Sequence, residues 1–581
     1  MTPSPLIIAG FHRSGTSMTA QQLQAAGLDL GSQLFGGTAS NPDGHFEDAD
    51  VVRLHDRALA ERDSNWQHAD PTPIAVSLQR KRSFEAYVRR RSEPGTLWGF
   101  KDPRVCLFLE TWAEICPSLS VVMVYRDYWS CTASLRDRHS LALIQGSSKN
   151  VHLRFWLEPE LPLKMWLAYN RRLVEFARHH PGRCLVVSQD AVLHGYPIAA
   201  AVRRELGLPL EPQPPGTVNP LYAKAPSQPF FAVTGELQRE LDGLWNELQT
   251  LSLDAAAEHE LSHGEPAAVD ASCDELRQRL IALCQEQCKP AADEPGLPKS
   301  LPSKLRACDI ESIGDRLLAE GSSARAADLF ARGVREFPRR PRFRLRLADA
   351  LAQQDRLAEA ESVLREGILR FPGHRPLQLR LAGIHASRLH FDAARQLWLQ
   401  TLQNEPKSLE ALGRLAALAL SESDFPEAER LIADGLDTDP AHAPLLMALA
   451  RLRAAQGRKG ECADIVAALL HQAGQTSRFG AALGRLLIDL GFQEEVGQWL
   501  TRAREAAPDE PAIEEQWCRW LYREGRTAEA LEHKSAAVKR LFQQRDQSPR
   551  LMSLVSRVSD EGCRRDLMSR FCKHIAALLA A

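Results

Sequence analysis

The chain has 581 residues, of which 44% are hydrophobic and 25% are charged, and its formal net charge is −2. A chain of this length is too long for one hydrophobic core, so two or more domains are expected. The near-neutral charge excludes a global basic field for nucleic acid or an anionic membrane, so any anion site must be built locally.

Cysteine usage and the N-terminus indicate a cytoplasmic protein. The twelve cysteines are scattered, as expected of reduced and mostly buried thiols. The closest pair, Cys284 and Cys288, has no second cysteine or histidine pair around it, so a zinc site is not expected. The first apolar run is one strand long with no basic segment before it, and no stretch approaches the ~20 apolar residues of a membrane span. We therefore expect neither a signal peptide nor a membrane span.

Residues 1–225 alternate strand-like and helix-like segments. Short apolar runs bounded by turn residues predict strands at 6–9, 97–100, 121–125 and 184–187. Helical patterns between these runs cover residues 16–26, 107–114 and 166–179. Strands that alternate with helices are typical of a parallel α/β sheet, which is the fold class expected for this region.

The turn after the first strand has a composition suited to an anion. Gly10 and Gly15 let the backbone wrap closely around a ligand, and the N–H groups of the loop and of the first helical turn would point at it. A Walker A loop needs Lys immediately before its Ser or Thr. Here Thr16 follows Gly15 directly, and the cation is Arg13, inside the loop. The sequence therefore predicts a phosphate loop unlike that of ordinary ATP or GTP hydrolases, the alternative being a turn with no ligand.

A second cationic motif follows the predicted strand at 121–125. Arg126 stands at the end of this strand, and Ser134 and Arg138, at positions i and i+4, share one helix face. Two guanidinium groups and a hydroxyl suit a dianionic phosphate. The alternative is that Arg126 pairs with Asp127 or Asp137 at the surface.

Three segments of the N-terminal region resemble those of sulfotransferases. The run Arg13-Ser-Gly-Thr-Ser resembles their 5′-phosphosulfate loop, and the spacing of Arg126, Ser134 and Arg138 resembles their 3′-phosphate motif. A third segment, Gly99-Phe-Lys-Asp-Pro-Arg, resembles the family's Lys-Asp-Pro segment after a strand. The resemblance spans about residues 5–225 and is closest to the bacterial and protein-tyrosine sulfotransferases.

This resemblance implies a P-loop-like parallel sheet flanked by helices and an enzyme that uses 3′-phosphoadenylyl sulfate (PAPS) as co-substrate. It implies that a sulfuryl group moves by in-line displacement to a hydroxyl acceptor, with Arg13 at the bridging oxygen of the donor. The donor-binding residues implied by the two motifs are Gly10, Arg13, Ser14, Gly15, Thr16, Ser17, Arg126, Ser134 and Arg138.

Sulfuryl transfer resembles phosphoryl transfer in needing in-line positioning, charge stabilisation and a base for the acceptor hydroxyl. Arg13 and Lys101 are the candidate catalytic cations, which would stabilise the leaving phosphate. Lys101 has a second interpretation, as a salt-bridge partner of Asp102 or Glu110. The motifs require no metal ion, since arginine and lysine can supply the charge that Mg²⁺ supplies in kinases.

The candidate base lies in the turn at residues 41–48. The family places a glutamate shortly after a glycine here, and Glu47 after Gly44 matches this pattern. His45 is the main rival, because cytosolic members of the superfamily use a histidine base. Glu47 has a second interpretation, as a cap of the helix that follows. Weaker candidates for the base are His12, His55 and Asp48.

A late loop and a linker follow the α/β region. Family members bring a late loop back over the nucleotide, so Tyr222 and Lys224 are candidates for contacts to adenine or the 3′-phosphate, unless this loop is a plain domain exit. Residues 226–305 form a helical linker region, with helical patterns at 235–251 and 271–287. Four prolines between residues 289 and 304 indicate the linker itself.

Residues 306–545 carry a helical repeat of 34 residues. One column of turn residues is Pro338, Pro372, Pro406, Pro440, Gly474 and Pro508. A second column, 12 residues before each of these, is Ala326, Ala360, Ala394, Ala428, Cys462 and Val496, with Ala530 one step further. Two columns in phase resemble the tetratricopeptide repeat, in which a small residue lets paired helices approach and a proline separates the units. We expect an all-α solenoid here, capped by C-terminal helices at residues 546–581.

The array and the acceptor leave alternatives open. Stacked helix pairs give an extended surface suited to a peptide or partner protein, or to self-association. The acceptor could be a hydroxyl on a peptide, a glycan or a small molecule. Two rival functions are an ATP-dependent small-molecule kinase and a non-catalytic nucleotide-binding scaffold; the missing Walker lysine and the Arg126 motif disfavour the kinase.

Overall fold

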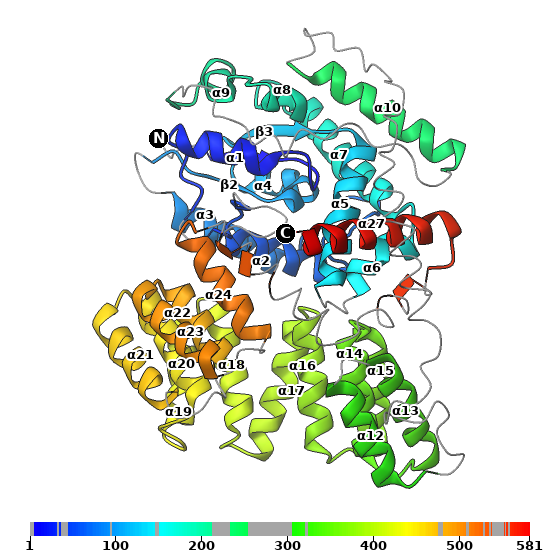
Figure 1. Ribbon diagram of the computed structural model, residues 1–581. Helices are drawn as coiled ribbons and strands as arrows, with labels where there is room; N and C mark the ends of the chain where they lie inside the picture. The colour runs from blue at the N-terminus through cyan, green and yellow to red at the C-terminus, as the bar shows by residue number, and fades with distance from the viewer. Residues whose placement is uncertain are drawn as a thin grey trace. The chain divides into compact units, whose positions relative to one another are not determined.

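The computed structural model describes residues 5–31, 34–35, 44–92, 96–145, 150–211, 233–253, 305–319, 323–473, 480–506, 511–526, 529–530, 532–533, 536, 551, 554–555 and 558–580 (Figure 1). The chain divides into two compact units. The first comprises Met1–Ser147, Val151–Ala291 and Asp546–Ala581, and the second comprises Ser148–Asn150 and Ala292–Arg545. Tyr222, Lys224, the helix predicted at 271–287 and the linker at 289–304 lie outside the described residues.

The first unit contains a four-stranded parallel sheet, as expected from the sequence. Its strands are β1 (Leu6–Ala9), β2 (Gly99–Lys101), β3 (Ser120–Tyr125) and β4 (Cys184–Ser188), in the order β2-β1-β3-β4. In register, Ile8 pairs with Lys101 and Val122, and Tyr125 pairs with Ser188. Every residue of β1 and β3 is buried, as expected of parallel strands covered on both faces.

The parallel arrangement fixes where the predicted motifs lie. The chain leaves β1, β2 and β3 at the same edge of the sheet, because the carboxyl ends of parallel strands meet there. The loop from Gly10 follows β1, Asp102 follows β2, and Arg126 follows β3. Three segments that are distant in the sequence are therefore brought to one edge.

Helices cover this sheet. In chain order they are α1 (Thr16–Ala25), α2 (Ala49–Ala60), α3 (Leu78–Arg91), the 3-10 helix η1 (Pro103–Phe108), α4 (Leu109–Ile115), α5 (Tyr128–Ile144), α6 (Asn150–Leu157), α7 (Leu161–His179), α8 (Gln189–Leu193), α9 (Ile198–Leu206) and α10 (Gly235–Leu251). Apolar side chains of α1 and α9 pack against Leu6, Ile8 and Val122 on one face of the sheet. The helix predicted at 107–114 is divided between η1 and α4. None of the helices in the described part of the chain is long and apolar enough to span a membrane.

The second unit is a stack of helix pairs. Each pair has a first and a second helix: α12 (Ala307–Ala319) with α13 (Ser323–Glu336), α14 (Pro341–Gln353) with α15 (Leu357–Arg370), α16 (Arg375–Ser387) with α17 (Phe391–Asn404), α18 (Leu409–Ser421) with α19 (Phe425–Leu436), α20 (Ala443–Ala455) with α21 (Lys459–Ala473), and α22 (Gly480–Leu490) with α23 (Gln493–Ala506). A further helix, α24 (Pro511–Arg523), follows them. The prolines at 338, 372, 406 and 440 lie in the turns between pairs, and Gly474 and Pro508 lie outside the described residues.

Small residues bring the helices of the array together. The predicted column from Ala326 to Val496 lies on the second helices and is buried throughout. A further column, also spaced by 34 residues, is buried on the first helices: Gly314, Ala348, Ala382, Ala416, Ala450 and Gly484. A Cβ atom on Gly314 would come within 2.3 Å of the Phe330 ring, so only glycine fits there without movement.

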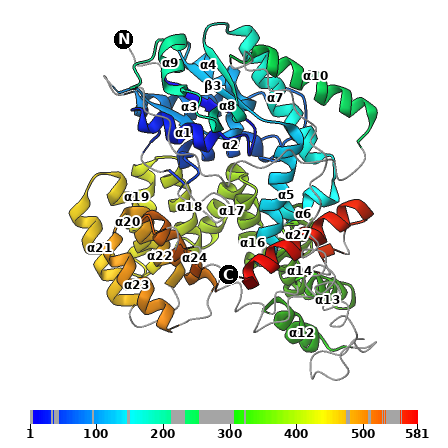
Figure 2. The same cartoon turned by 45° about the horizontal axis from the view of Figure 1, so that its top comes forward.

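The last helix, α27 (Glu561–Ala580), belongs to the first unit, together with the rest of residues 546–581. It packs against α5, as the red helix beside α5 and α6 shows in Figures 1 and 2. The sequence led us to expect these residues to cap the repeat array. Instead, Arg136 and Asp137 of α5 form ion pairs with charged residues of α27. The helical pattern alone does not reveal these pairs.

Candidate active site

The loop between β1 and α1 requires its two glycines. A Cβ atom on Gly10 would lie 2.3 Å from the carbonyl oxygen of Val124, and Gly15 has a φ of +91°. Arg13, between them, also adopts a positive φ of 70°. The residue at the N-cap of α1 is Gly15, which has no side chain to accept from the N–H groups of the first turn. A helix start of this kind favours an anion.

The structure brings the two cationic motifs together. The Nε atom of Arg13 donates a hydrogen bond of 2.9 Å to the hydroxyl of Ser134, and Arg126 donates one of 3.1 Å to the carbonyl of Arg13. These contacts join the loop after β1 to residues 113 and 121 positions later. The predicted 5′- and 3′-phosphate motifs thus form one cluster.

Neither Arg126 nor Arg138 pairs with a carboxylate of the described residues within 4 Å. Asp127 caps α5 by accepting a 2.7 Å hydrogen bond from the N–H of Ser130, and Asp137 forms its ion pair with Arg570. The pairing of Arg126 with either aspartate, the alternative considered from the sequence, is therefore absent. Burial lowers the pKa of the Arg138 guanidinium, and the Glu47 carboxylate offsets part of that effect.

Lys101 and Glu47 form a buried ion pair. The ammonium of Lys101, on the last residue of β2, is 2.8 Å from Oε1 of Glu47, and the two backbones meet in a parallel bridge. Lys101 is 2% exposed, so Glu47 takes the place of water beside its ammonium. Its partner is neither Asp102 nor Glu110, the two alternatives considered from the sequence. Asp48, not Glu47, caps α2 by accepting from the N–H of Asp50.

The pKa of Glu47 reflects two opposing effects. Burial raises it, but the Lys101 ammonium, with smaller contributions from His45 and Arg104, brings it below its ordinary value. Burial lowers the pKa of His45 to about 3, although Glu47 acts in the opposite direction. At neutral pH the carboxylate is ionised and the imidazole is neutral, so both can accept a proton, and Glu47 carries the charge.

The weaker candidates for a base have other partners. Nδ1 of His55 donates to Asp102 at 2.6 Å, and its Nε2 accepts a 2.9 Å hydrogen bond from the indole of Trp112. His55 is fully buried, so it acts as a core residue that holds Asp102. Asp48 accepts from Asp50 and from the Tyr87 hydroxyl at 3.0 Å. Burial lowers the pKa of His12 to about 3, next to Arg104.

The structure adds residues that the sequence did not single out. Arg104 forms ion pairs with Asp102 at 2.8 Å and with Asp56 at 2.9 Å, which raises its pKa against the effect of burial. His139 follows Arg138 on α5; its ring stacks on Trp66 with centroids 5.5 Å apart. Burial, His152 and Arg138 lower the pKa of His139. Only its position next to Arg138 could have indicated His139 beforehand.

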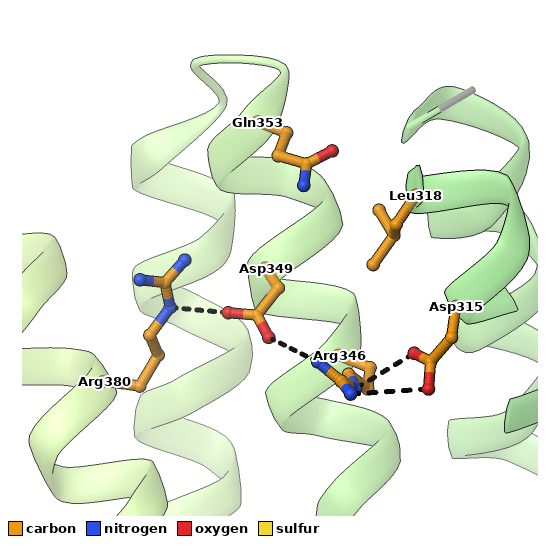
Figure 3. Close-up of a pocket in the computed structure, with 6 residues that line it drawn as sticks. All are labelled: Asp315, Leu318, Arg346, Asp349, Gln353 and Arg380. Atoms are coloured by element: carbon orange, nitrogen blue, oxygen red, sulfur yellow. Dashed lines mark hydrogen bonds and ion pairs between the residues drawn. The ribbon is translucent and has the colours of Figure 1, made fainter. Parts of the chain in front are cut away.

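Acidic and basic side chains form a chain of ion pairs along the first helices of the array. Figure 3 shows Arg346 between Asp315 and Asp349, with ion pairs of 3.1 and 3.6 Å, and Arg380 2.7 Å from Asp349. These four residues and Gln353 line a pocket of about 420 Å³. Each arginine here has a carboxylate beside it, so this part of the first-helix layer is close to neutral.

The balance of positive and negative charge on the first helices changes further along the array. The residues at 34-residue steps from Asp315, which we call the first-helix column, are Asp315, Asp349, Gly383, Ala417, Arg451, Arg485 and Arg519. Asp489 lies 3.9 Å from Arg485 and 2.8 Å from Arg519. Arg451 is exposed and makes no ion pair within the described ranges. Three arginines therefore share one carboxylate.

Comparisons with known proteins concern the array. The family model for the tetratricopeptide repeat matches residues 317–383 and 419–486. No curated protein matches the chain. Similar solved structures include a tetratricopeptide repeat protein from Parabacteroides merdae (12% identity, 46% of this chain and 98% of that chain, TM-score 0.31) and a thermophilic repeat protein of Thermus thermophilus (18% identity, 39% and 99%, TM-score 0.23). The matched family residues and the 34-residue columns agree: the C-terminal region carries tetratricopeptide repeats.

Proposed function

We propose that the first unit is a sulfotransferase that moves a sulfuryl group from PAPS to a hydroxyl acceptor. The observation that carries this proposal is the junction between the two motifs, in which Arg13 bonds to Ser134 and Arg126 bonds to the carbonyl of Arg13. A donor with both a 5′-phosphosulfate and a 3′-phosphate needs cationic and hydroxyl groups for two anions side by side. A nucleotide with only a 5′-phosphate would offer no phosphate to Arg126 and Arg138.

The residues at this junction fit such a donor. Gly10 keeps the loop close to β3, and the uncapped start of α1 offers N–H groups to the 5′-phosphate. Arg126, Ser134 and Arg138 would hold the 3′-phosphate, and no carboxylate of the described residues pairs with either arginine. When bound, PAPS supplies an activated sulfuryl group on a phosphate that can leave as 3′,5′-ADP.

The residues of the site can account for each bond and proton of the proposed transfer. The bond between sulfur and the bridging oxygen breaks, a bond from sulfur to the acceptor oxygen forms, and the acceptor loses its proton. Glu47, ionised at neutral pH, would take this proton, with His45 as the alternative base. Arg13 and Lys101 would stabilise the charge that develops on the leaving phosphate. Lys101 lies beside Glu47, so one ion pair would serve both sides of the reaction.

Nucleotide preference tests the proposal. The full chain is unfolded by heat in the presence of 3′,5′-ADP or of 5′-ADP; a ligand at 100 times its Kd adds about 2.7 kcal/mol of stability. We expect a strong preference for 3′,5′-ADP that Arg126→Ala abolishes, while Arg203→Ala, at an exposed position of α9, keeps it. An equal response to both nucleotides would contradict the proposal, and a preference for 5′-ADP would favour the kinase.

We propose further that the array binds an acidic segment of the acceptor or of a partner protein. The helices α18, α20, α22 and α24 contact one another in succession and form one layer. Among the described residues of this layer, Arg451, Arg485 and Arg519 share a single carboxylate, so a stretch of Asp or Glu residues would complete the pairing. The neutral chain of ion pairs around Arg346 offers no such surplus of positive charge.

A further inference from the structure

The C-terminal helix contacts the helix that carries half of the candidate donor site. Arg570 of α27 forms an ion pair with Asp137 of α5 and donates a 3.2 Å hydrogen bond to the carbonyl of Ala133. One turn earlier, Asp566 accepts hydrogen bonds of 3.1 Å from Arg136 and from the indole of Trp156. The residues of α5 that α27 contacts thus alternate with Ser134 and Arg138.

These contacts are buried. The side chain of Arg136 is fully buried, and those of Asp566 and Arg570 are 11% and 10% exposed. Apolar residues of α27, among them Leu567 and Phe571, are buried beside them. Charges in such surroundings depend on their partners, because water does not replace a partner that is removed.

The charge of Asp137 matters for the neighbouring site. Asp137 directly precedes Arg138 on α5, and a carboxylate there that is not paired with Arg570 would attract the guanidinium that is expected to bind the 3′-phosphate. Arg570 compensates this charge, and Arg138 makes no ion pair with a carboxylate of the described residues. The fixed cation that achieves this lies 433 residues away in the sequence.

We propose that Asp566 and Arg570 are positioning residues for the donor site. Asp566 holds α5 through Arg136, and Arg570 neutralises Asp137, so that Ser134 and Arg138 remain available to the 3′-phosphate. This inference rests on the proposed sulfotransferase function. It makes the segment that follows the repeat array a part of the nucleotide-binding unit.

A pair of variants tests this role in the full chain. Arg570→Gln removes the ion pair between Arg570 and Asp137, and we expect the Kd for 3′,5′-ADP, measured by calorimetry, to rise about tenfold. The Kd for 5′-ADP should change much less, since it has no 3′-phosphate. The double variant Asp137→Asn/Arg570→Gln also removes the carboxylate charge next to Arg138 and should return the affinity for 3′,5′-ADP to within about threefold of wild type. The matched control is Arg565→Gln, an exposed position of the same helix.

Two results would overturn the inference while leaving the proposed function intact. The first is a wild-type preference for 3′,5′-ADP that Arg570→Gln leaves unchanged. The second is an equal loss of affinity for both nucleotides that the double variant does not restore, which would mark α27 as a structural support only. If the wild-type protein shows no preference for 3′,5′-ADP, the proposed function fails, and this inference fails with it.

Discussion

At the scale of single residues, the pairing of Glu47 with Lys101 concentrates the proposed chemistry in one contact. The two residues lie 54 positions apart, and the carboxylate of Glu47 compensates the buried ammonium of Lys101. The pair also makes the carboxylate available without protonation, since the ammonium lowers its pKa. In the proposed reaction, one ion pair at the end of β2 would therefore supply both the base and a cation for the leaving group.

Substituting either member separates chemistry from nucleotide binding. We expect Glu47→Gln and Lys101→Met each to slow the release of 3′,5′-ADP from PAPS by about 100-fold or more, since each removes a proton acceptor or a charge at the reacting atoms. Glu47→Gln should keep its affinity for 3′,5′-ADP, whereas Arg126→Ala loses it. The rate is measured by chromatography of the nucleotide product, and Glu85→Gln, at an exposed position of α3, serves as the control. A Glu47→Gln rate within threefold of wild type would rule out Glu47 as the base and move attention to His45.

The buried histidines make the stability of the first unit depend on pH. His12 has a pKa of about 3 in the folded chain against an ordinary value of 6.5, because burial disfavours its charged form. The unfolded chain therefore binds more protons below pH 6.5, and stability is lost as the pH falls from 6.5 towards 3. Between pH 7 and pH 5, this histidine alone should lower the free energy of unfolding by about 2 kcal/mol.

Urea unfolding at pH 7 and pH 5 measures this loss. We expect His12→Asn to reduce the difference in unfolding free energy between the two pH values by about 1 to 2 kcal/mol, whatever its effect at pH 7. His194→Asn, whose side chain is 69% exposed, should leave the difference as it is in wild type. An unchanged pH dependence in His12→Asn would show that His12 is charged without cost in the folded chain.

At the scale of elements, the change along the first-helix column separates two halves of the array. Asp315 and Asp349 give way to arginines at positions 451, 485 and 519. The backbone repeats while its charge does not, so helix packing alone does not require the arginines. This difference is the basis for expecting an acidic partner on the later repeats.

A labelled peptide of consecutive glutamates tests this surface. We expect the full chain to bind it with an affinity that falls as salt rises, and Arg451→Glu/Arg485→Glu to weaken binding by about tenfold or more. Arg325→Glu/Arg502→Glu, on the second helices α13 and α23, makes the same change of charge away from the first-helix layer and should have less than a threefold effect. Equal losses in both variants would indicate attraction by overall charge, and tighter binding of a nucleic acid of the same length would replace the acidic-segment proposal.

The sequence predicted elements better than it predicted partners. The strand Leu6–Ala9 and helix Gly235–Leu251 were predicted with their observed bounds, and the 34-residue columns gave the phase of the array, because periodic burial is a local signal. The pairing of Lys101 with Glu47 was not predicted, although both were candidates, because a salt bridge across 54 residues leaves no periodic trace. The same holds for Arg104, whose two aspartates belong to different elements.

At the scale of the whole molecule, the repeat array is inserted in the sequence between two parts of one unit. The chain leaves the first unit at Ala291 and returns to it at Asp546. The sequence placed residues 546–581 with the array, since a helix after a solenoid is ordinarily its cap. Buried charges decide otherwise, because Arg136 of α5 has its carboxylate partner on α27.

Removing residues 546–581 tests this organisation. The truncation removes Asp566, the carboxylate partner of Arg136, and the buried apolar side chains of Leu567 and Phe571. We expect the thermal transition of the first unit to fall by about 5 °C or more, while that of the array, followed in the same scan, stays within about 1 °C. The ligand identifies the transition of the first unit, because only that transition should rise with 3′,5′-ADP. A synthetic peptide of residues 558–581 should restore it, and the same peptide with Asp566→Asn and Arg570→Gln should not. A drop confined to the array transition would instead assign α27 to the repeats as their cap.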